Sequence, residues 1–207
     1  MMVSVTVVYE YRPGSLYLNI TNRCSNRCTF CVRQTPGFSL AGFDMRLERE
    51  PTAAEVLEAV DQALALRGEP FDEVVFCGFG EPTHRLDLIR AVGTTLRQGG
   101  QSPPLVRLNT NGQAALLNPG CDSVEELDGA LDTVSISLNA PDPETYLELC
   151  RPRHGPRAHA AVLDFARRCV GRIPRVTLTV VSGTIGAAQV RRCAELARAL
   201  GAGFRVR

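Results

Sequence analysis

Three closely spaced cysteines follow the first apolar run of the chain, in the stretch CSNRCTFC. They are Cys24, Cys28 and Cys31, separated by three and then two intervening residues. Thiolates bind soft metals, and three of them can hold a cubane iron–sulfur cluster whose fourth iron stays open. Because an open iron can bind a small chelating molecule, this spacing indicates a cluster that works on a ligand.

Zinc binding and simple packing are the alternatives for these cysteines. Structural zinc is nearly always held by four ligands, usually in pairs two residues apart. The sequence has no second cysteine pair of this kind, and its three histidines, His84, His154 and His159, lack paired spacing. Cysteines can also pack as small hydrophobes. The neighbours of the three thiols are polar, which a core corner would not supply: Asn22, Arg23, Ser25, Asn26 and Arg27.

Polar motifs also stand at the ends of the next three strand-like runs. They are GFGEP at 78–82, NTNG at 109–112, and Ser137 with Asn139 in the run TVSISLNA. Active sites of parallel β/α barrels lie at the carboxyl ends of the strands. The four strand ends therefore predict one site on one rim.

The elements that must position these motifs alternate between strands and helices. Core strands are expected near 15–21, 73–80, 105–112, 133–140, 175–181 and 204–207, after a short strand near 3–11. Helices are expected near 53–68, opened by a Thr52–Glu55 capping box, and near 85–98, 143–150, 157–171 and 186–200. A short helix is expected behind a Ser123–Glu126 capping box, and a long loop over 32–50.

Helical crossovers between consecutive strands predict a parallel sheet. A complete eight-stranded barrel usually needs about 250 residues. The 207 residues therefore predict a single α/β domain over 1–207, a partial (β/α)6 TIM-like barrel that is laterally open, with a short N-terminal strand extension. A flat doubly wound sheet is the alternative.

Composition narrows the class of protein. Hydrophobic residues make up 44% and charged residues 22%, as in ordinary globular domains, and the net charge of +1 does not indicate a nucleic-acid or membrane partner. No run approaches the roughly 18 apolar residues of a membrane span, and the start does not look like a signal peptide. We therefore expect a cytoplasmic protein, whose eight cysteines stay reduced.

The cysteine motif, with Phe30 before its last cysteine, resembles the signature of radical S-adenosylmethionine (radical SAM) enzymes. GFGEP resembles the GGE motif of the same superfamily. Further stretches resemble the TatD-associated radical SAM proteins over essentially the whole chain: YLNITNRC, GFDMRLEREPT, VRLNTNG, VSISLNAPDPETYLELCRP and FRVR.

This resemblance implies a cofactor set and a role for each motif. Cys24, Cys28 and Cys31 would ligate a 4Fe-4S cluster, and the amino and carboxylate groups of S-adenosyl-L-methionine (SAM) would chelate its fourth iron. The other implied SAM contacts are Phe30 near the adenine, the backbone of Gly78, Phe79 and Gly80 at the amino group, Glu81 holding that turn, Asn109 and Thr110 on the third strand, and Ser137 and Asn139 at the ribose or carboxylate. Asn109 departs from the related activating enzymes, which have an acidic residue there.

The implied reaction is reductive cleavage of SAM to a 5′-deoxyadenosyl radical, which abstracts hydrogen from an unidentified substrate. The implied partners are a low-potential electron donor such as flavodoxin or ferredoxin, and a TatD-type hydrolase by family association. Two alternatives stay open: a non-catalytic iron–sulfur or zinc protein, and an activase that installs a glycyl radical on a partner protein. Cys150, followed by Arg151, Arg153 and His154, is read either as an anion site or as a solvated loop.

Overall fold

The computed structural model describes residues 7–34, 39–40, 42–99 and 102–207. Within these residues the main sheet has seven strands in the order β1-β2-β5-β6-β7-β8-β9. They are β1 (Val8–Arg12), β2 (Ser15–Leu18), β5 (Glu73–Phe76), β6 (Leu105–Thr110), β7 (Thr133–Ser137), β8 (Arg175–Val180) and β9 (Gly203–Val206). β1 pairs antiparallel with β2, and all later pairings in this sheet are parallel.

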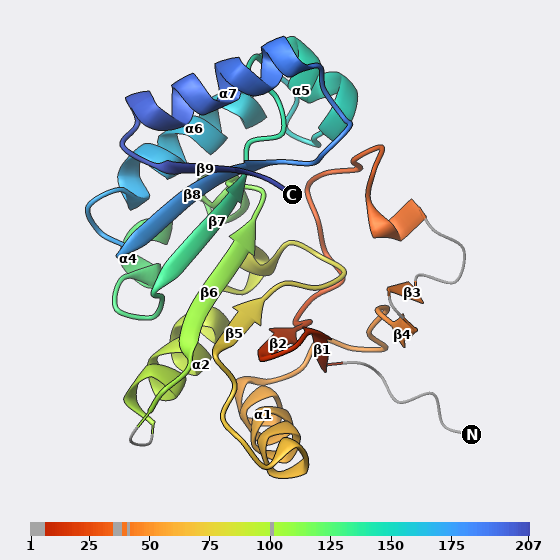
Figure 1. Ribbon diagram of the computed structural model, residues 1–207, viewed down its shortest axis with the longest axis vertical. Helices are drawn as coiled ribbons and strands as arrows, with labels where there is room; N and C mark the ends of the chain where they lie inside the picture. Colours follow the sequence, from red (N-terminus) through yellow and green to blue (C-terminus); the bar gives the residue numbers. More distant parts are fainter. Residues whose placement is uncertain (1–6, 35–38, 41, 100–101) are drawn as a thin grey trace.

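Helical segments connect the parallel strands. The helices are α1 (Ala53–Arg67), α2 (Leu86–Gln98), α3 (Ala114–Leu117), α4 (Ser123–Leu127), α5 (Pro143–Cys150), α6 (Arg157–Cys169) and α7 (Ala187–Ala199). Two 3-10 turns, η1 (Val32–Gln34) and η3 (Pro82–Arg85), and a small hairpin of β3 (Ser39–Leu40) and β4 (Phe43–Asp44) complete the described elements. Figure 1 shows a curved sheet whose two edges, β1 and β9, do not meet.

This arrangement confirms the predicted partial barrel. Six parallel strands with helical connections form an open α/β sheet among the described residues, and β1 is the expected N-terminal extension. Residues 3–6 of the strand expected at 3–11 lie outside the described residues. The capping box of Thr52 and Glu55 opens α1, and Gly68 ends it in the left-handed conformation.

Three local predictions were wrong or incomplete. The cap of α4 is Asp122 and not Ser123, because the Asp122 carboxylate accepts from the backbone N–H groups of Val124 and Glu125. The expected loop over 32–50 contains η1 and the β3–β4 hairpin. The short helix α3, which directly follows the NTNG motif, was not anticipated.

The two faces of the sheet differ in character, because successive strand residues point to opposite sides. The helix-covered side forms the main core, in which Leu18, Phe76, Leu108, Ile136 and Leu178 are fully buried. The inner side carries a smaller apolar cluster of Tyr9, Tyr17, Met45, Val75 and Phe79, against which the β3–β4 hairpin packs. This cluster covers the inner side over β1, β2 and β5. No helix among the described residues is long and apolar enough to cross a membrane.

Candidate functional site

We call residues 19–31, which follow the carboxyl end of β2 and contain Cys24, Cys28 and Cys31, the cysteine loop. Backbone hydrogen bonds connect this loop to its surroundings. The carbonyl of Arg23 accepts from the N–H of Glu81 at 2.7 Å. On the other side, the N–H groups of Arg27 and Thr29 donate to the carbonyls of Cys150 and Leu149, at 3.0 and 2.9 Å. These last carbonyls of α5 have no partner inside their own helix, so the loop satisfies them. The GFGEP motif and α5 therefore hold the loop from two sides.

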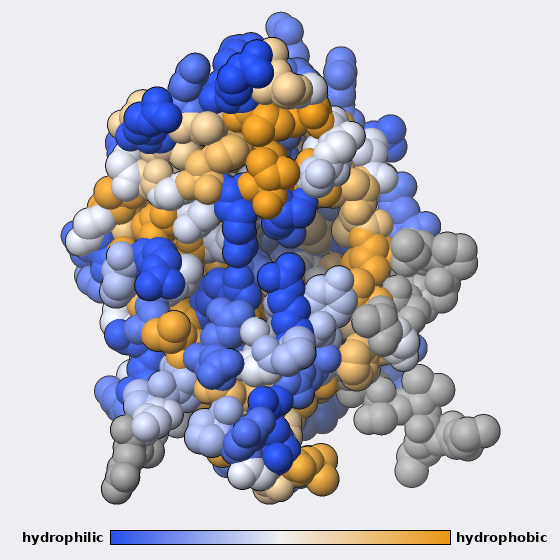
Figure 2. All heavy atoms as spheres, viewed as in Figure 1, coloured by the Kyte–Doolittle hydropathy of each residue, from blue (hydrophilic) through white to orange (hydrophobic). Residues whose placement is uncertain are grey.

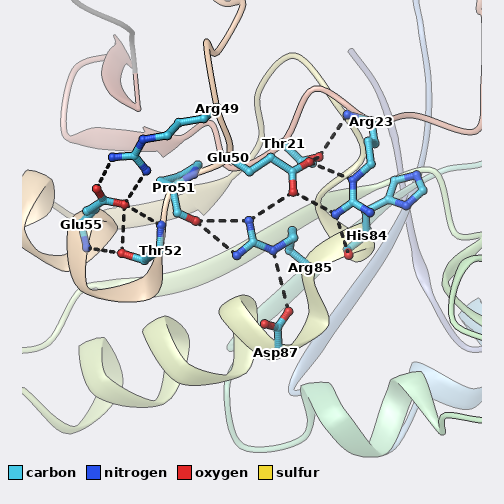
Figure 3. Close-up of polar contacts among 10 residues, drawn as sticks. All are labelled: Thr21, Arg23, Arg49, Glu50, Pro51, Thr52, Glu55, His84, Arg85 and Asp87. Atoms are coloured by element: carbon cyan, nitrogen blue, oxygen red, sulfur yellow. Dashed lines mark hydrogen bonds and ion pairs between the residues drawn. The ribbon is translucent and has the colours of Figure 1, made fainter.

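A charged cluster ties the start of this loop to the first turns of α1 and η3 (Figure 3). The Glu50 carboxylate accepts from the Thr21 hydroxyl at 2.5 Å and from two Arg23 nitrogens at 2.8 and 2.9 Å. Arg85 reaches the same carboxylate at 3.4 Å and also donates to the carbonyl of Pro51. Burial alone would raise the pKa of Glu50, but the hydrogen bonds from Arg23 and Thr21 outweigh it and lower that pKa. Ionised Glu50 therefore acts as a clamp, meaning that it holds the start of the cysteine loop, at Thr21 and Arg23, next to Arg85 of η3.

The glycines of GFGEP are required by close packing against the loop that follows β2. A Cβ atom at Gly80 would lie 2.4 Å from the carbonyl oxygen of Thr21 and 2.5 Å from that of Arg23. A Cβ atom at Gly78 would lie 2.2 Å from Oδ1 of Asn19 and 2.7 Å from its Cα. We expected these glycines to allow close approach of a ligand; the structure adds that the chain itself leaves no room for a side chain.

Glu81 joins three segments from a buried position. Its Oε1 accepts from the backbone N–H of Thr83 at 3.1 Å and from the hydroxyls of Thr83 and Thr110, both at 2.7 Å. Its Oε2 accepts from the N–H of Asn111 at 2.7 Å. Burial raises the pKa of this carboxyl, and the four hydrogen bonds partly oppose that shift. Glu81 thus caps η3 and fixes the end of β6 against the GFGEP turn.

A buried polar network beneath the cysteine loop was missed in the sequence. The Asn26 amide donates to the hydroxyl of Tyr146 at 3.1 Å, and Gln113 donates to both the Tyr146 hydroxyl and the Asn26 carbonyl, at 3.0 and 2.7 Å. A second link joins Asn111 to the Ser25 hydroxyl at 2.9 Å. Ser25 and Asn26 are each only 4% exposed, so their polarity marked a bonded network and not a solvated loop. The polar residues that follow the β6 end, Asn111 and Gln113, were the available signal.

The three thiols are half-buried, and a cavity of about 780 Å³ lies next to two of them. Cys28 and Cys31 line this cavity, together with the arginines Arg27, Arg33 and Arg151. Burial and the nearby Glu81 raise the pKa of Cys24 to about 12. Bound metal deprotonates a thiol outright, so these thiols need a strong cation to become thiolates. Thiols free of disulfide bonds next to a cavity with cationic walls fit an anionic iron–sulfur cluster.

Cys150 lies directly beside this loop, which the sequence did not predict. It is fully buried, and its interaction with the thiol of Cys28 raises the pKa of Cys28 and lowers that of Cys150. The Asn139 amide also donates to the sulfur of Cys150 at 3.5 Å. Among the described residues, no three His, Cys, Asp or Glu side chains are arranged to hold one metal ion. The three thiolates of a cubane each bind a different iron, which is a different arrangement.

The remaining predicted residues divide into groups with and without spare hydrogen-bonding capacity. The Thr110 hydroxyl is occupied by Glu81, and the Ser137 hydroxyl accepts from Arg207 at 3.0 Å. Oδ1 of Asn109 and Oδ1 of Asn139 are buried without a partner. Asn139 lies beyond the end of β7 with a φ of 60°, so its side chain does not follow the regular alternation of the strand that contains Ser137.

The two predicted aromatic residues pack in different cores. Phe30 lies at the edge of the main core, and Phe79 is buried in the inner-face cluster with the Arg33 guanidinium 4.9 Å from its ring centre. Of the other cysteines, Cys169 and Cys193 are buried in the main core, and Cys121 is exposed.

Comparisons with known proteins agree with this geometry. A family model described as "Radical SAM superfamily" matches residues 18–197. A probable dual-specificity RNA methyltransferase from Opitutus terrae is 35% identical over 138 residues, which are 61% of this chain and 33% of that protein. A GTP 3′,8-cyclase from Rhodococcus opacus is 29% identical over 152 residues, which are 73% of this chain and 39% of that protein. The chain thus spans well under half the length of these relatives.

Solved structures share the fold at low sequence identity. A radical SAM methyltransferase from Sphaerobacter thermophilus superposes with a TM-score of 0.63 at 21% identity, covering 96% of this chain and 57% of that one. SuiB from Streptococcus suis, solved with its precursor peptide SuiA, gives a TM-score of 0.67 at 20% identity, covering 94% of this chain and 39% of that one.

Proposed function

Because this chain belongs to the radical SAM superfamily, whose members use a 4Fe-4S cluster and SAM, we propose that it is the core of an enzyme that cleaves SAM reductively. Cys24, Cys28 and Cys31 hold the cluster in this proposal, and the radical produced abstracts hydrogen from a substrate. When bound, the cluster and SAM together supply the one-electron chemistry. The residues of this chain supply binding, orientation and exclusion of water.

One observation carries the proposal: the cysteine loop and the GFGEP motif pack against each other at the mouth of the open barrel. Gly80 touches the carbonyls of Thr21 and Arg23, and the Glu81 N–H donates to the carbonyl of Arg23. The two segments are therefore held in a fixed position relative to each other, and a cofactor could contact both at once. A structural zinc site would use the three thiols, but it would not explain why the GFGEP motif packs against the cysteine loop.

The buried residues around the loop act as positioning groups. Glu81 holds the end of β6 against the GFGEP turn through Thr110 and Asn111. The network of Asn26, Gln113 and Tyr146 supports the loop from below and lies away from water. Fixing ligands to within a fraction of an ångström is the main contribution a protein can make to such a reaction.

The substrate and partners belong to the proposal as well. The two curated relatives are named for RNA and GTP, so a substrate that carries phosphate is the class they favour for this chain. A flavodoxin or ferredoxin is the electron donor we propose, and a TatD-type hydrolase is proposed as a functional partner. A reducing compartment such as the cytoplasm suits the free thiols.

The test is formation of 5′-deoxyadenosine. Protein reconstituted anaerobically with iron and sulfide is mixed with SAM and a low-potential reductant, and the products are separated by chromatography. We expect 5′-deoxyadenosine and methionine from the wild type and from Cys121→Ala, whose exposed thiol is a matched control. Cys24→Ala, Cys28→Ala and Cys31→Ala should abolish both. No product from protein with a full complement of iron would refute the proposal.

A further inference from the structure

Three arginines gather on the inner side of the sheet, over its β6–β9 half. Arg107 lies on β6, Arg205 lies on β9, and Arg207 directly follows β9. The Arg205 guanidinium donates to the Ser135 hydroxyl at 3.4 Å, and that of Arg207 donates to the Ser137 hydroxyl at 3.0 Å. Both serines lie on β7, so the two side chains cross β8 and extend towards Arg107. We call Arg107, Arg205 and Arg207 the arginine cluster.

The arginine cluster carries more positive than negative charge. Arg107 donates to the carboxylate of Glu73 at 2.7 Å, which neutralises one guanidinium. The contacts of Arg205 and Arg207 named above are to neutral hydroxyls. The pKa of Arg205 is lowered by burial and by the nearby cations Arg107, Arg12 and Arg207, with Glu73 as the opposing charge. Like charges held this close repel one another, and a bound anion would relieve the repulsion.

Two buried polar atoms at the arginine cluster have no hydrogen-bond partner within the part of the chain that the structure describes. Arg107 is only 9% exposed, yet its Nε is buried without an acceptor. Oδ1 of Asn109, two residues further along the same face of β6, is also buried without a partner. A buried polar group without a partner is destabilising, so such groups often mark the place of a ligand. The donor suits an anionic oxygen, and the acceptor suits a hydroxyl beside it.

The inner side is open to solvent at β9, whereas Arg107 of the cluster and Ser135 beneath it are buried. The apolar cluster of Tyr17, Met45, Val75 and Phe79 covers β2 and β5 and stops short of the β6–β9 half. Arg205 and Arg207 are exposed. Figure 2 shows hydrophilic side chains gathered in a hollow over the middle strands of the sheet. The arginine cluster also lies near the GFGEP turn, because Arg107 on β6 pairs in the sheet with Val75 on β5, three residues before Gly78.

We propose that the arginine cluster binds a phosphate group of the substrate, an inference that rests on the proposed function. Guanidinium groups form paired, charge-assisted hydrogen bonds with phosphate oxygens, and Arg is favoured where such planar recognition is needed. Arg205 and Arg207 form no ion pair with a carboxylate among the described residues, so the two guanidinium groups match the double charge of a phosphate ester better than a single carboxylate. The position beside the GFGEP turn brings the phosphorylated substrate next to the SAM site.

The test is binding of inorganic pyrophosphate to reconstituted protein saturated with SAM, measured by titration calorimetry. We expect saturable binding by the wild type and binding weaker by about ten- to a hundredfold in Arg205→Gln and in Arg207→Gln. Arg205→Lys, which keeps the charge but loses the planar fork, should fall in between. Arg191→Gln, an exposed arginine on α7, is the matched control and should bind as the wild type does. Because the mutated side chains are exposed, thermal unfolding of each variant should match the wild type.

Four results would overturn the inference: no saturable binding, the same loss in Arg191→Gln, tighter binding of malonate than of pyrophosphate, or displacement of SAM by pyrophosphate. The malonate arm separates a carboxylate ligand from a phosphate ligand. SAM cleavage by the wild type is measured separately. Protein that cleaves SAM but does not bind pyrophosphate refutes only this inference. Protein that binds pyrophosphate but does not cleave SAM refutes only the proposed function.

Discussion

Replacing Gly80 by alanine tests whether the glycine motif and the cysteine loop depend on each other. The new Cβ would lie 2.4 Å from the carbonyl oxygen of Thr21 and 2.5 Å from that of Arg23. Carbon and oxygen make contact at about 3.3 Å or more, so each carbonyl must move by nearly 1 Å. Both carbonyls belong to the segment that leads directly into Cys24.

The expected effect on stability follows from overpacking. Adding a methyl group to a closely packed site costs about 1–3 kcal/mol, and two simultaneous clashes with backbone place Gly80→Ala near about 3 kcal/mol. For a chain of this size, about 2–4 °C of melting temperature is lost per kcal/mol. The melting temperature should therefore fall by about 6–12 °C. A misplacement of about 1 Å can lower a reaction rate by about a hundredfold, which we expect for 5′-deoxyadenosine formation.

Gly93→Ala provides a matched control. Its Cβ would lie 2.4 Å from the carbonyl oxygen of Ala130, a clash of the same size at a place where α2 packs on the segment after α4. The gain of about 1 kcal/mol in helix propensity partly offsets this clash. The assays are thermal unfolding by circular dichroism, iron content after reconstitution, and SAM binding by equilibrium dialysis. Gly93→Ala should lose some stability and keep normal iron content and SAM affinity.

Two outcomes would refute this reasoning. Gly80→Ala with the melting temperature of the wild type would show that the close packing is absent. Gly80→Ala that loses stability but binds iron and SAM as tightly as Gly93→Ala would show that the packing around Gly80 does not position the cysteine loop.

Three further predictions concern the polar supports of the loop. Glu81→Gln turns an amide group towards hydroxyl and N–H donors, so the free energy of unfolding in urea should fall by about 1–3 kcal/mol; an unchanged value would contradict the role of Glu81. Tyr146→Phe keeps the ring but removes the acceptor for Asn26 and Gln113, and should also lower the unfolding free energy by about 1–3 kcal/mol, whereas wild-type stability would mean that the network is dispensable. The pKa of Glu50 is lowered in the folded state. Ionised Glu50 therefore stabilises the fold fully above its ordinary pKa of 4.5, and this stabilisation is lost as the pH falls through the lower pKa of the folded state. Glu50→Gln should therefore lose about 0.2–1 kcal/mol at neutral pH and flatten the acid decline of the melting temperature; an identical acid profile would argue against the clamp.

The sequence predicted the elements well where one local signal decided them. The Thr52–Glu55 capping box and Gly68 set both ends of α1, and the continuous apolar run that begins at residue 73 predicted the strand β5. The wrong cap at α4 shows the limit of such signals, because two adjacent residues could both serve and Asp122 reached two N–H groups.

The candidate site was predictable in outline and not in its supports. Strand-end positions brought the cysteines, GFGEP and NTNG together, since carboxyl ends of parallel strands share an edge. The contacts of Tyr146 and Cys150 with the loop depend on where α5 packs, which a single sequence does not specify. The arginine cluster likewise required the register of β6 to β9, because Arg107 and Arg205 lie far apart in the chain.

The most direct measurement is electron–nuclear double resonance of the reduced enzyme with SAM labelled at its amino nitrogen and carboxylate oxygen. If Cys24, Cys28 and Cys31 hold the cluster as proposed, one iron is left for these two groups, so both labels should show hyperfine coupling to the cluster. Cys121→Ala should give the same spectrum. Absence of coupling from both labels, in protein shown to bind SAM and to carry a full cluster, would contradict the assignment of Cys24, Cys28 and Cys31.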